Sequence, residues 1–140
     1  MALSVSVAPA ELARVAALAY QGQSVRVSLA SVGLTGYTDT STVTQWDSIK
    51  LSGNGYADFT TTVAEGGYDS IDDRYELGAD VGANTFIDAT FTATGGDLVY
   101  DRIYVVLGTN NLHSVLYETP AVTLSSGSSI TYRIQLAVGG

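Results

Sequence analysis

Histidine and cysteine, the side chains most often used as a base or a nucleophile, are nearly absent from this sequence. His113 is the only histidine, and there is no cysteine. A serine hydrolase would need His113 beside a nucleophilic serine, yet the chain has no Gly-x-Ser-x-Gly motif. Ser114 follows directly in a predicted strand, where neighbouring side chains point to opposite faces. The sequence therefore does not predict that His113 and Ser114 form a nucleophile–base pair.

Carboxylates, which serve glycosidases and calcium sites, gather in residues 64–84. This stretch holds six acidic residues and four glycines, and Arg74 is its only cation. Glycoside cleavage needs two carboxylates fixed about 5–10 Å apart across a cleft. Residues 69–73 also lack the central glycine and terminal glutamate of a calcium-binding loop. We expect residues 64–84 to form a long acidic loop in which residues 75–77 are briefly extended. We expect this loop to hold no metal, and the protein to use no cofactor and not to be an enzyme.

The overall charge restricts the partners. The chain carries 6 basic and 14 acidic residues, a net charge of −8. Affinity for phosphate comes chiefly from Lys and Arg, so nucleic acid and anionic membrane surfaces are not expected partners. No segment reaches the roughly 18 apolar residues that span a bilayer. The first twenty residues lack a basic lead-in and carry Glu11 and Arg14, unlike a signal peptide, so we expect folding in a cytosol.

Aromatic residues are the strongest candidates for an interaction surface. The chain has nine tyrosines and one tryptophan. Tyrosine offers a large contact area and a hydroxyl that tolerates water, which suits both protein interfaces and sugar sites. Subunit packing and carbohydrate binding therefore both stay open. The candidates that lie in or beside predicted loops and turns are Tyr37, Trp46, Tyr56, Tyr68 and Tyr75.

Most of the chain shows the alternation of apolar and polar residues that is typical of strands. Residues 103–107 are apolar on both faces, which predicts a central strand, whereas residues 131–138 alternate and predict one wet face. Short strands separated by Gly-rich turns predict an all-β fold, an antiparallel β-sandwich or jelly roll. Tyr104, Val106, Ile134 and Leu136 are expected in its buried centre. The predicted strands are residues 3–7, 24–32, 57–63, 86–93, 98–107, 113–118 and 130–138.

Two of these segments carry more specific expectations. In residues 24–32 we expect Val25, Val27 and Leu29 to point inward, and Arg26 and Ser28 to point outward to solvent. Residues 43–51 give a mixed pattern, which we interpret as a short helical turn running into an extended segment.

One short N-terminal helix is expected besides the strands. Pro9 suits its first position, apolar residues recur at helical spacing from Leu12, and Gly22 ends it. A length of 140 residues suits one domain. We therefore expect a single β domain over residues 1–140, in which the strand and helix of residues 1–22 form either a cap on the β core or an arm for assembly.

A resemblance rests on the run from Trp46 to Tyr56, which fits W-x-x-x-x-L-S-G-N-G-Y. This run is similar to a segment of small virion-associated proteins of tailed phages, particularly cyanophages. The resemblance covers roughly residues 20–138. It departs at residues 126–128, where the family usually has Gly-Gln-Thr or a like turn and this chain has Ser-Gly-Ser. Further segments similar in order and spacing are 68–77, 100–106, 113–115, 118–120 and 131–134.

The resemblance implies a small β-rich structural part of a virion, displayed on the tail, the fibre or the head surface. Such a protein would fold in the host cytoplasm and act through contacts with other virion proteins and with copies of itself, as a homo-oligomer. The alternative is a carbohydrate-binding β-sandwich module that contributes to host attachment. The oligomeric state distinguishes the two, because a sugar-binding module can act as a monomer whereas an assembly part must associate.

Overall fold

The computed structural model describes residues 22–31, 36–69, 74–78, 87–134 and 136–139. These residues are mostly strands in antiparallel sheets, which confirms the all-β expectation at this level. They group into two compact units, and the larger comprises Ser24–Thr61 and Asp88–Tyr132. The N-terminal strand and helix expected before Gly22 lie outside the described residues.

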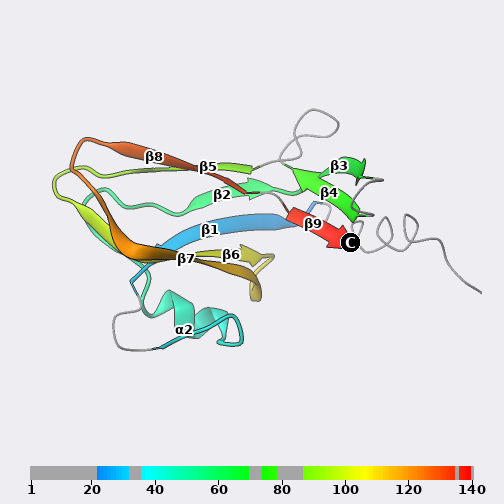
Figure 1. The fold of residues 1–140 in the computed structure, drawn as a ribbon, viewed down its shortest axis with the longest axis horizontal. Coiled ribbons are helices and arrows are strands. Elements are labelled where there is room, and N and C mark those ends of the chain that lie inside the picture. Colours follow the sequence, from blue (N-terminus) through cyan, green and yellow to red (C-terminus); the bar gives the residue numbers. More distant parts are fainter. Residues whose placement is uncertain (1–21, 32–35, 70–73, 79–86, 135, 140) are drawn as a thin grey trace, which may run out of the picture. The chain divides into compact units, whose positions relative to one another are not determined.

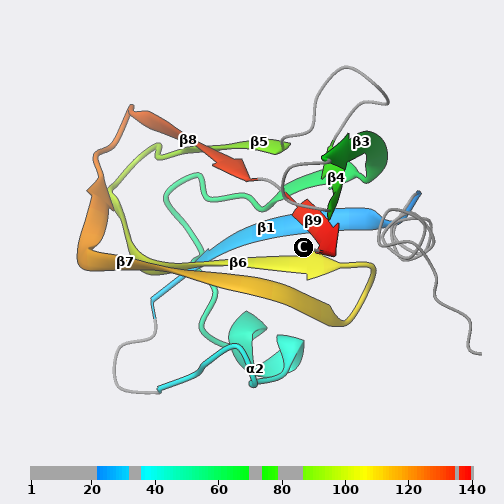
Figure 2. The ribbon, with the colours of Figure 1, turned by 45° about the vertical axis from the view of Figure 1, so that its right-hand side comes forward.

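A four-stranded sheet forms the larger unit's centre, in the order β2-β1-β6-β7 (Figure 1). A second sheet pairs β5 with β8. Figures 1 and 2 show this pair on one side of the four-stranded sheet and the short helix α2 on the other. The bounds are β1 Ser24–Ala30, α2 Val43–Asp47, β2 Phe59–Thr62, β5 Ile87–Thr92, β6 Leu98–Leu107, β7 Asn111–Leu124 and β8 Ser129–Ile134.

The two middle strands of the four-stranded sheet, β1 and β6, are buried on both faces. On the face away from α2, Val27 lies opposite Val105, and both side chains are fully buried. On the face toward α2, Tyr104 and Val106 are equally buried. Strand 103–107 is therefore central, as its two apolar faces predicted. Tyr104, Val106 and Ile134 are buried as expected, and the side chain of Leu136 lies outside the described residues.

Helix α2 covers one face of the sheet with a small apolar cluster. Thr42 caps the helix and exchanges hydrogen bonds with Gln45, the reciprocal pair of a capping box. Val43 and Trp46 point to the sheet, where they pack with Ala30, Tyr104 and Val106. The expectation of a short helical turn in residues 43–51 is thus confirmed. None of the described helices is long and apolar enough to cross a bilayer.

The smaller unit corrects the expectation of a long acidic loop at residues 64–84. Its chain forms two strands, β3 Ala64–Asp69 and β4 Arg74–Gly78, and β4 also pairs with β9 Leu136–Gly139. Glycine and acidic residues are poor strand formers, so the sequence around them gives little strand signal. Strand β4 also gains backbone hydrogen bonds from β9, about sixty residues further along the chain, which a local pattern cannot reveal. Residues 75–77 are extended, as expected.

Two strand boundaries also differ from the predicted ones. The predicted strand 130–138 is described as two strands that pair in different sheets, β8 with β5 and β9 with β4. In the sequence, apolar and polar residues alternate through the whole of residues 131–138, so this pattern alone predicts a single strand. The predicted strand 113–118 is longer, because β7 resumes its pairing with β6 after an irregular stretch. This stretch contains Pro120, which has no N–H to donate to a neighbouring strand.

Candidate functional site

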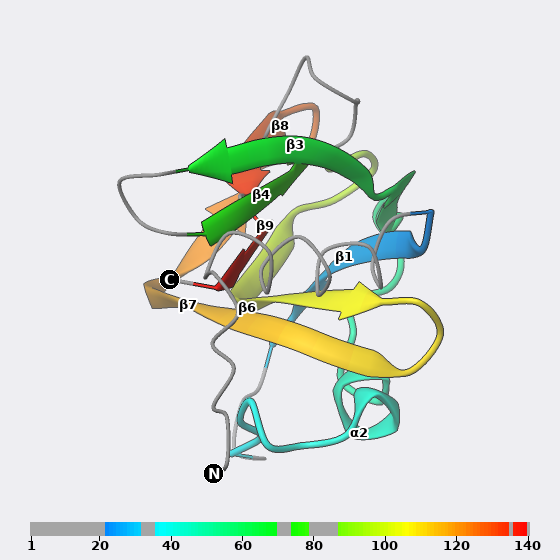
Figure 3. The ribbon, with the colours of Figure 1, turned by 90° about the vertical axis from the view of Figure 1, so that its right-hand side faces the viewer.

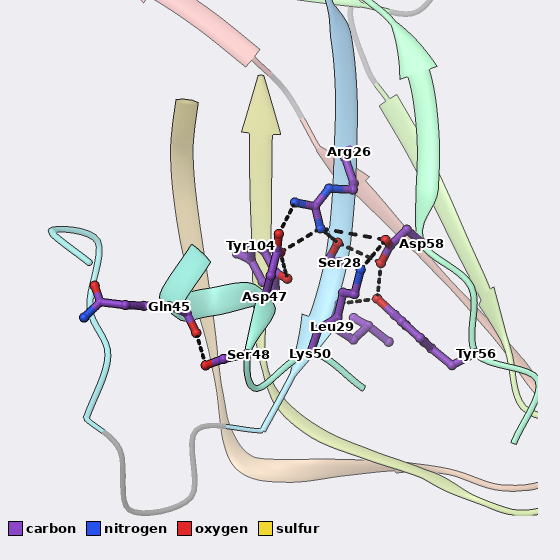
Figure 4. A network of polar contacts seen from close by, with 10 residues as sticks. All are labelled: Arg26, Ser28, Leu29, Gln45, Asp47, Ser48, Lys50, Tyr56, Asp58 and Tyr104. Atoms are coloured by element: carbon purple, nitrogen blue, oxygen red, sulfur yellow. Dashed lines mark hydrogen bonds and ion pairs between the residues drawn. The ribbon is translucent and has the colours of Figure 1, made fainter. Parts of the chain in front are cut away.

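A connected group of polar side chains lies on the side of β1 and β6 that faces α2 (Figure 4). Strand β1 contributes two of its members, β6 and α2 contribute one each, and the segment between α2 and β2 contributes three. We call this group the polar network. Its members are Arg26, Ser28, Asp47, Lys50, Tyr56, Asp58 and Tyr104.

Asp47, the last residue of α2, is bonded to both central strands. Its carboxylate accepts a two-pronged contact from Arg26, with Nη1–Oδ1 at 2.9 Å and Nη2–Oδ2 at 3.1 Å. The hydroxyl of Tyr104 donates to the same Oδ1 at 2.7 Å. A planar guanidinium fork on a carboxylate is a strong and directional pair. These contacts fix the end of α2 on the sheet.

Asp58 is the second carboxylate of the network. It accepts hydrogen bonds from Ser28 Oγ at 2.8 Å, from the Tyr56 hydroxyl at 2.7 Å and from Lys50 Nζ at 2.9 Å. Ser28 in turn accepts from Arg26 Nη1 at 2.9 Å. The two cations and two carboxylates thus balance in charge, and all four are hydrogen-bonded within the network.

Tyr56 completes the edge of β1 where β2 no longer runs beside it. Its hydroxyl accepts a hydrogen bond from the backbone N–H of Leu29 at 2.9 Å, while Leu51 N–H donates to the carbonyl of Leu29 at 3.0 Å. The ring of Tyr56 stacks on Phe91 with the ring centroids 6.2 Å apart. The segment that follows α2 therefore substitutes for a neighbouring strand.

The electrostatic environment keeps the carboxylates charged and the phenols neutral. Burial acts to raise the pKa of Asp58, but hydrogen bonds from Lys50, Tyr56 and Ser28 outweigh it and the pKa is lowered. The pKa of Asp47 is lowered in the same way, because bonds from Arg26 and Tyr104 outweigh burial. Burial and the adjacent carboxylates raise the pKa of both phenols. None of these groups is poised to exchange a proton near neutral pH.

These shifts predict a loss of stability in acid. Because the pKa of Asp47 and of Asp58 is lower in the folded chain than its ordinary 3.8, the unfolded chain binds protons more readily. The stabilisation is complete above that value and is lost as the pH falls through the folded pKa. We expect the free energy of unfolding, measured by urea denaturation, to fall steadily below about pH 4.

Other carboxylates of this acidic chain also titrate in that range, so a variant must isolate the network's share. Asp58→Asn should show a flatter dependence on pH below about pH 4 than the unmodified protein. Two parallel curves, offset by a constant free energy, would contradict the assignment of the shift to Asp58.

The structure gives two of the five aromatic candidates internal roles. Trp46 is 0% exposed: its ring packs on Tyr104 at 5.3 Å, and its Nε1 donates to the Thr38 carbonyl at 3.0 Å. This corrects the expectation that Trp46 offers a surface to a partner. Tyr56 is half-buried and is engaged in the network. Aromatic residues in loops were expected to be exposed. These two rings are not, because both loops fold back onto the sheet.

The remaining three candidates keep their status as predictions. Tyr37 is half-buried, with its ring edge-on to Trp46 at a centroid distance of 6.2 Å. Tyr68 and Tyr75 are directly opposite each other in the pairing of β3 with β4. Their side chains lie outside the described ones.

The L-S-G-N-G-Y run that carries the resemblance has structural roles. Asn54 adopts φ 51° between two glycines of positive φ, and its side chain donates to the Asp97 carbonyl at 2.9 Å. A Cβ on Gly55 would lie 2.0 Å from Thr94 Oγ1, so only glycine fits this close approach. The run therefore binds the turn before β2 to the turn between β5 and β6.

His113 and Ser114 are closer than predicted. The imidazole Nδ1 lies 3.2 Å from Ser114 Oγ, because the pairing of β6 and β7 shifts by one residue at this point. The shift breaks the strict alternation that was expected to separate the two side chains. His113 is exposed and has no carboxylate partner among the described contacts, so the third member of a triad is not in place.

The described residues contain no cluster of three or more His, Cys, Asp or Glu that could hold a metal ion.

A shallow hollow of about 320 Å³ lies against the network, lined by residues 50–53 and 56–58. Comparison of the chain with known protein families, with curated proteins and with solved structures gives no match.

Proposed function

We propose that this protein is a non-enzymatic structural component of a phage virion, located on the tail, the fibre or the head surface. The virion setting rests on the resemblance of residues 46–56, and one structural observation supports a role in assembly. The side chains of the polar network are bonded to one another and hold α2 on the sheet, whereas large apolar side chains are exposed on β6 and β7. Val99 is 49% exposed, Leu116 is 40% exposed and Tyr117 is 52% exposed. Leu116 and Tyr117 lie on β7, an outer strand of the sheet, where exposed apolar side chains can contact a partner protein.

The architecture of the larger unit supports the same proposal. A four-stranded sheet with a strand pair on one face (Figure 2) is compatible with a β-sandwich or jelly roll, an architecture found in viral capsid proteins and also in lectins. Within it Tyr100 on β6 and Tyr132 on β8 hydrogen-bond through their hydroxyls, which ties the two sheets together. Hydrogen bonds between the two sheets suit a part that is assembled once and then stays in place.

The hollow beside Tyr56 favours the alternative, a carbohydrate-binding module for host attachment. Lys50, Tyr56 and Asp58 are among the residues that line it, and an aromatic side chain beside a few polar groups is typical of small-ligand sites. Against this alternative, Lys50, Tyr56 and Asp58 already satisfy one another. A sugar would have to displace these hydrogen bonds or bind through the hydrogen-bonding capacity that they leave unused.

Incorporation into particles tests the proposal. Replacing Tyr68 and Tyr75 together by Ser is expected to leave the isolated protein folded and to abolish its incorporation, because aromatic contact area at the β3–β4 hairpin is lost. The measurement is mass-spectrometric quantification of the chain in purified virions, which also gives its copy number.

The matched control is the double Tyr→Phe variant, which keeps both rings and should incorporate normally. Normal incorporation of the double Ser variant would mean that these positions face solvent, and sugar binding would gain ground. Absence of the unmodified chain from purified particles would refute the structural function itself.

A further inference from the structure

Strand β7 forms one edge of the four-stranded sheet, and β2 forms the other. Figure 3 shows β6 and β7 side by side as a hairpin. Along its other side, β7 is paired with none of the described strands. The outward N–H and C=O groups of an edge strand are a template for pairing with another chain.

The two edges are protected very differently. Edge strands are normally kept from pairing by short length, by charge, by proline or by irregular geometry. Strand β2 has only four residues. The second half of β7 carries Glu118 and Pro120 within its irregular stretch. The first half, Asn111–Tyr117, contains neither a charged residue nor a proline, and the single shift at His113 is its one irregularity.

This first half also carries exposed apolar side chains on both faces. Leu116 lies opposite Ile103 and Tyr117 lies opposite Arg102, so the two point to opposite faces of the sheet. The Arg102 guanidinium sits 4.4 Å from the centre of the Tyr117 ring and holds it against the sheet. An added strand would cover apolar surface on both faces at little cost in side-chain ordering.

We infer that residues 113–117 of this edge pair with the same residues of a second copy of this chain, in an antiparallel arrangement centred on Val115. In this register Val115 meets Val115, Leu116 meets Ser114, and Tyr117 meets His113. Leu116 and Ser114 share one face of β7, so the large side chain of each copy fits beside the small one of the other. The inference rests on the proposed assembly function and names the partner.

Charge restricts where two copies of this chain can meet. Two chains of net charge −8 repel each other at long range, so they can meet only where short-range attraction is strong and local charge is absent. Asn111–Tyr117 is a seven-residue run without an acidic side chain. Backbone hydrogen bonds across a shared edge supply the attraction, and the two sheets become one continuous sheet.

A single introduced cysteine tests the register directly, because the chain has none of its own. Val115→Cys is expected to form a covalent dimer with a short bismaleimide cross-linker, since the two copies of residue 115 would be cross-strand neighbours about 5 Å apart. Val99→Cys is the matched control: it introduces the same change at an exposed valine of β6, away from the edge, and should remain monomeric on denaturing gels.

A second pair of variants tests the pairing of this edge without a chemical cross-linker. Leu116→Lys places a charge on the edge, as natural edge strands do, and should shift the protein from dimer to monomer in sedimentation equilibrium; Val99→Lys should not. Monomeric unmodified protein at the highest attainable concentration would overturn the inference. So would a dimer that survives Leu116→Lys and that Val115→Cys fails to capture. In that last case the chain still assembles, through another surface, and the proposed structural function stands.

Discussion

Trp46→Ala is expected to lower the free energy of unfolding by about 3–5 kcal/mol, the largest effect of any single substitution proposed for this chain. The indole is fully buried between α2 and the sheet and contacts Tyr104 and Val106. Its removal leaves a cavity that a five-residue helix cannot close, because Asp47 fixes the end of that helix to the strands. The carbonyl of Thr38 also loses its donor.

Chemical denaturation followed by circular dichroism measures this effect, since the substitution removes the only tryptophan. Trp46→Phe is the matched control: it keeps an aromatic ring but loses the N–H, and should cost clearly less than the alanine variant. A loss below about 1 kcal/mol for Trp46→Ala would mean that α2 is not part of the cooperative core. Trp46 would then be available to a partner, as its sequence position suggested.

Much of the larger unit was predictable because its strands alternate or are apolar on both faces. Strand β5 shows the alternation of Ile87, Ala89 and Phe91 in sequence and in burial. Residues 103–107 of β6 are apolar on both faces, and the structure buries them on both. The smaller unit was less predictable, since β3 and β4 are Gly-rich and acidic, and β4 also pairs with the distant strand β9.

The polar network was missed for a related reason. The alternation of β1 correctly placed Arg26 and Ser28 on one face, but that face was assigned to solvent. The structure covers it with α2 and the following segment, so Ser28 is fully buried and Arg26 is half-buried. One signal was available: Thr42 and Gln45 fit a capping box immediately before Trp46 and Asp47, which predicts a helix with its own face to bury.

Asp58→Ala is expected to lower the free energy of unfolding by about 2–3 kcal/mol, below the range for a fully buried ion pair because the side chain is partly solvated. Asp58 is the acceptor for Ser28, Tyr56 and Lys50 together. Its removal leaves the buried Ser28 hydroxyl without its acceptor, and Lys50 and Arg26 with one carboxylate between them. An unmet buried donor costs more than a hydrogen bond contributes when formed.

Asp58→Asn separates charge from hydrogen bonding in that loss. The amide keeps one acceptor oxygen and nearly the same shape, so it can still receive the hydroxyl of Ser28 or of Tyr56 while removing the negative charge. We expect it to cost less than the alanine variant at neutral pH, and the difference between the two to persist at high salt, because salt screens the ion pairs and leaves the hydrogen bonds. Equal losses for both variants, reduced equally by salt, would show that charge alone holds this part of the sheet together. In that case the Tyr56 hydroxyl would be stabilised mainly by the Leu29 amide, and the segment after α2 would owe its place beside β1 to backbone pairing alone.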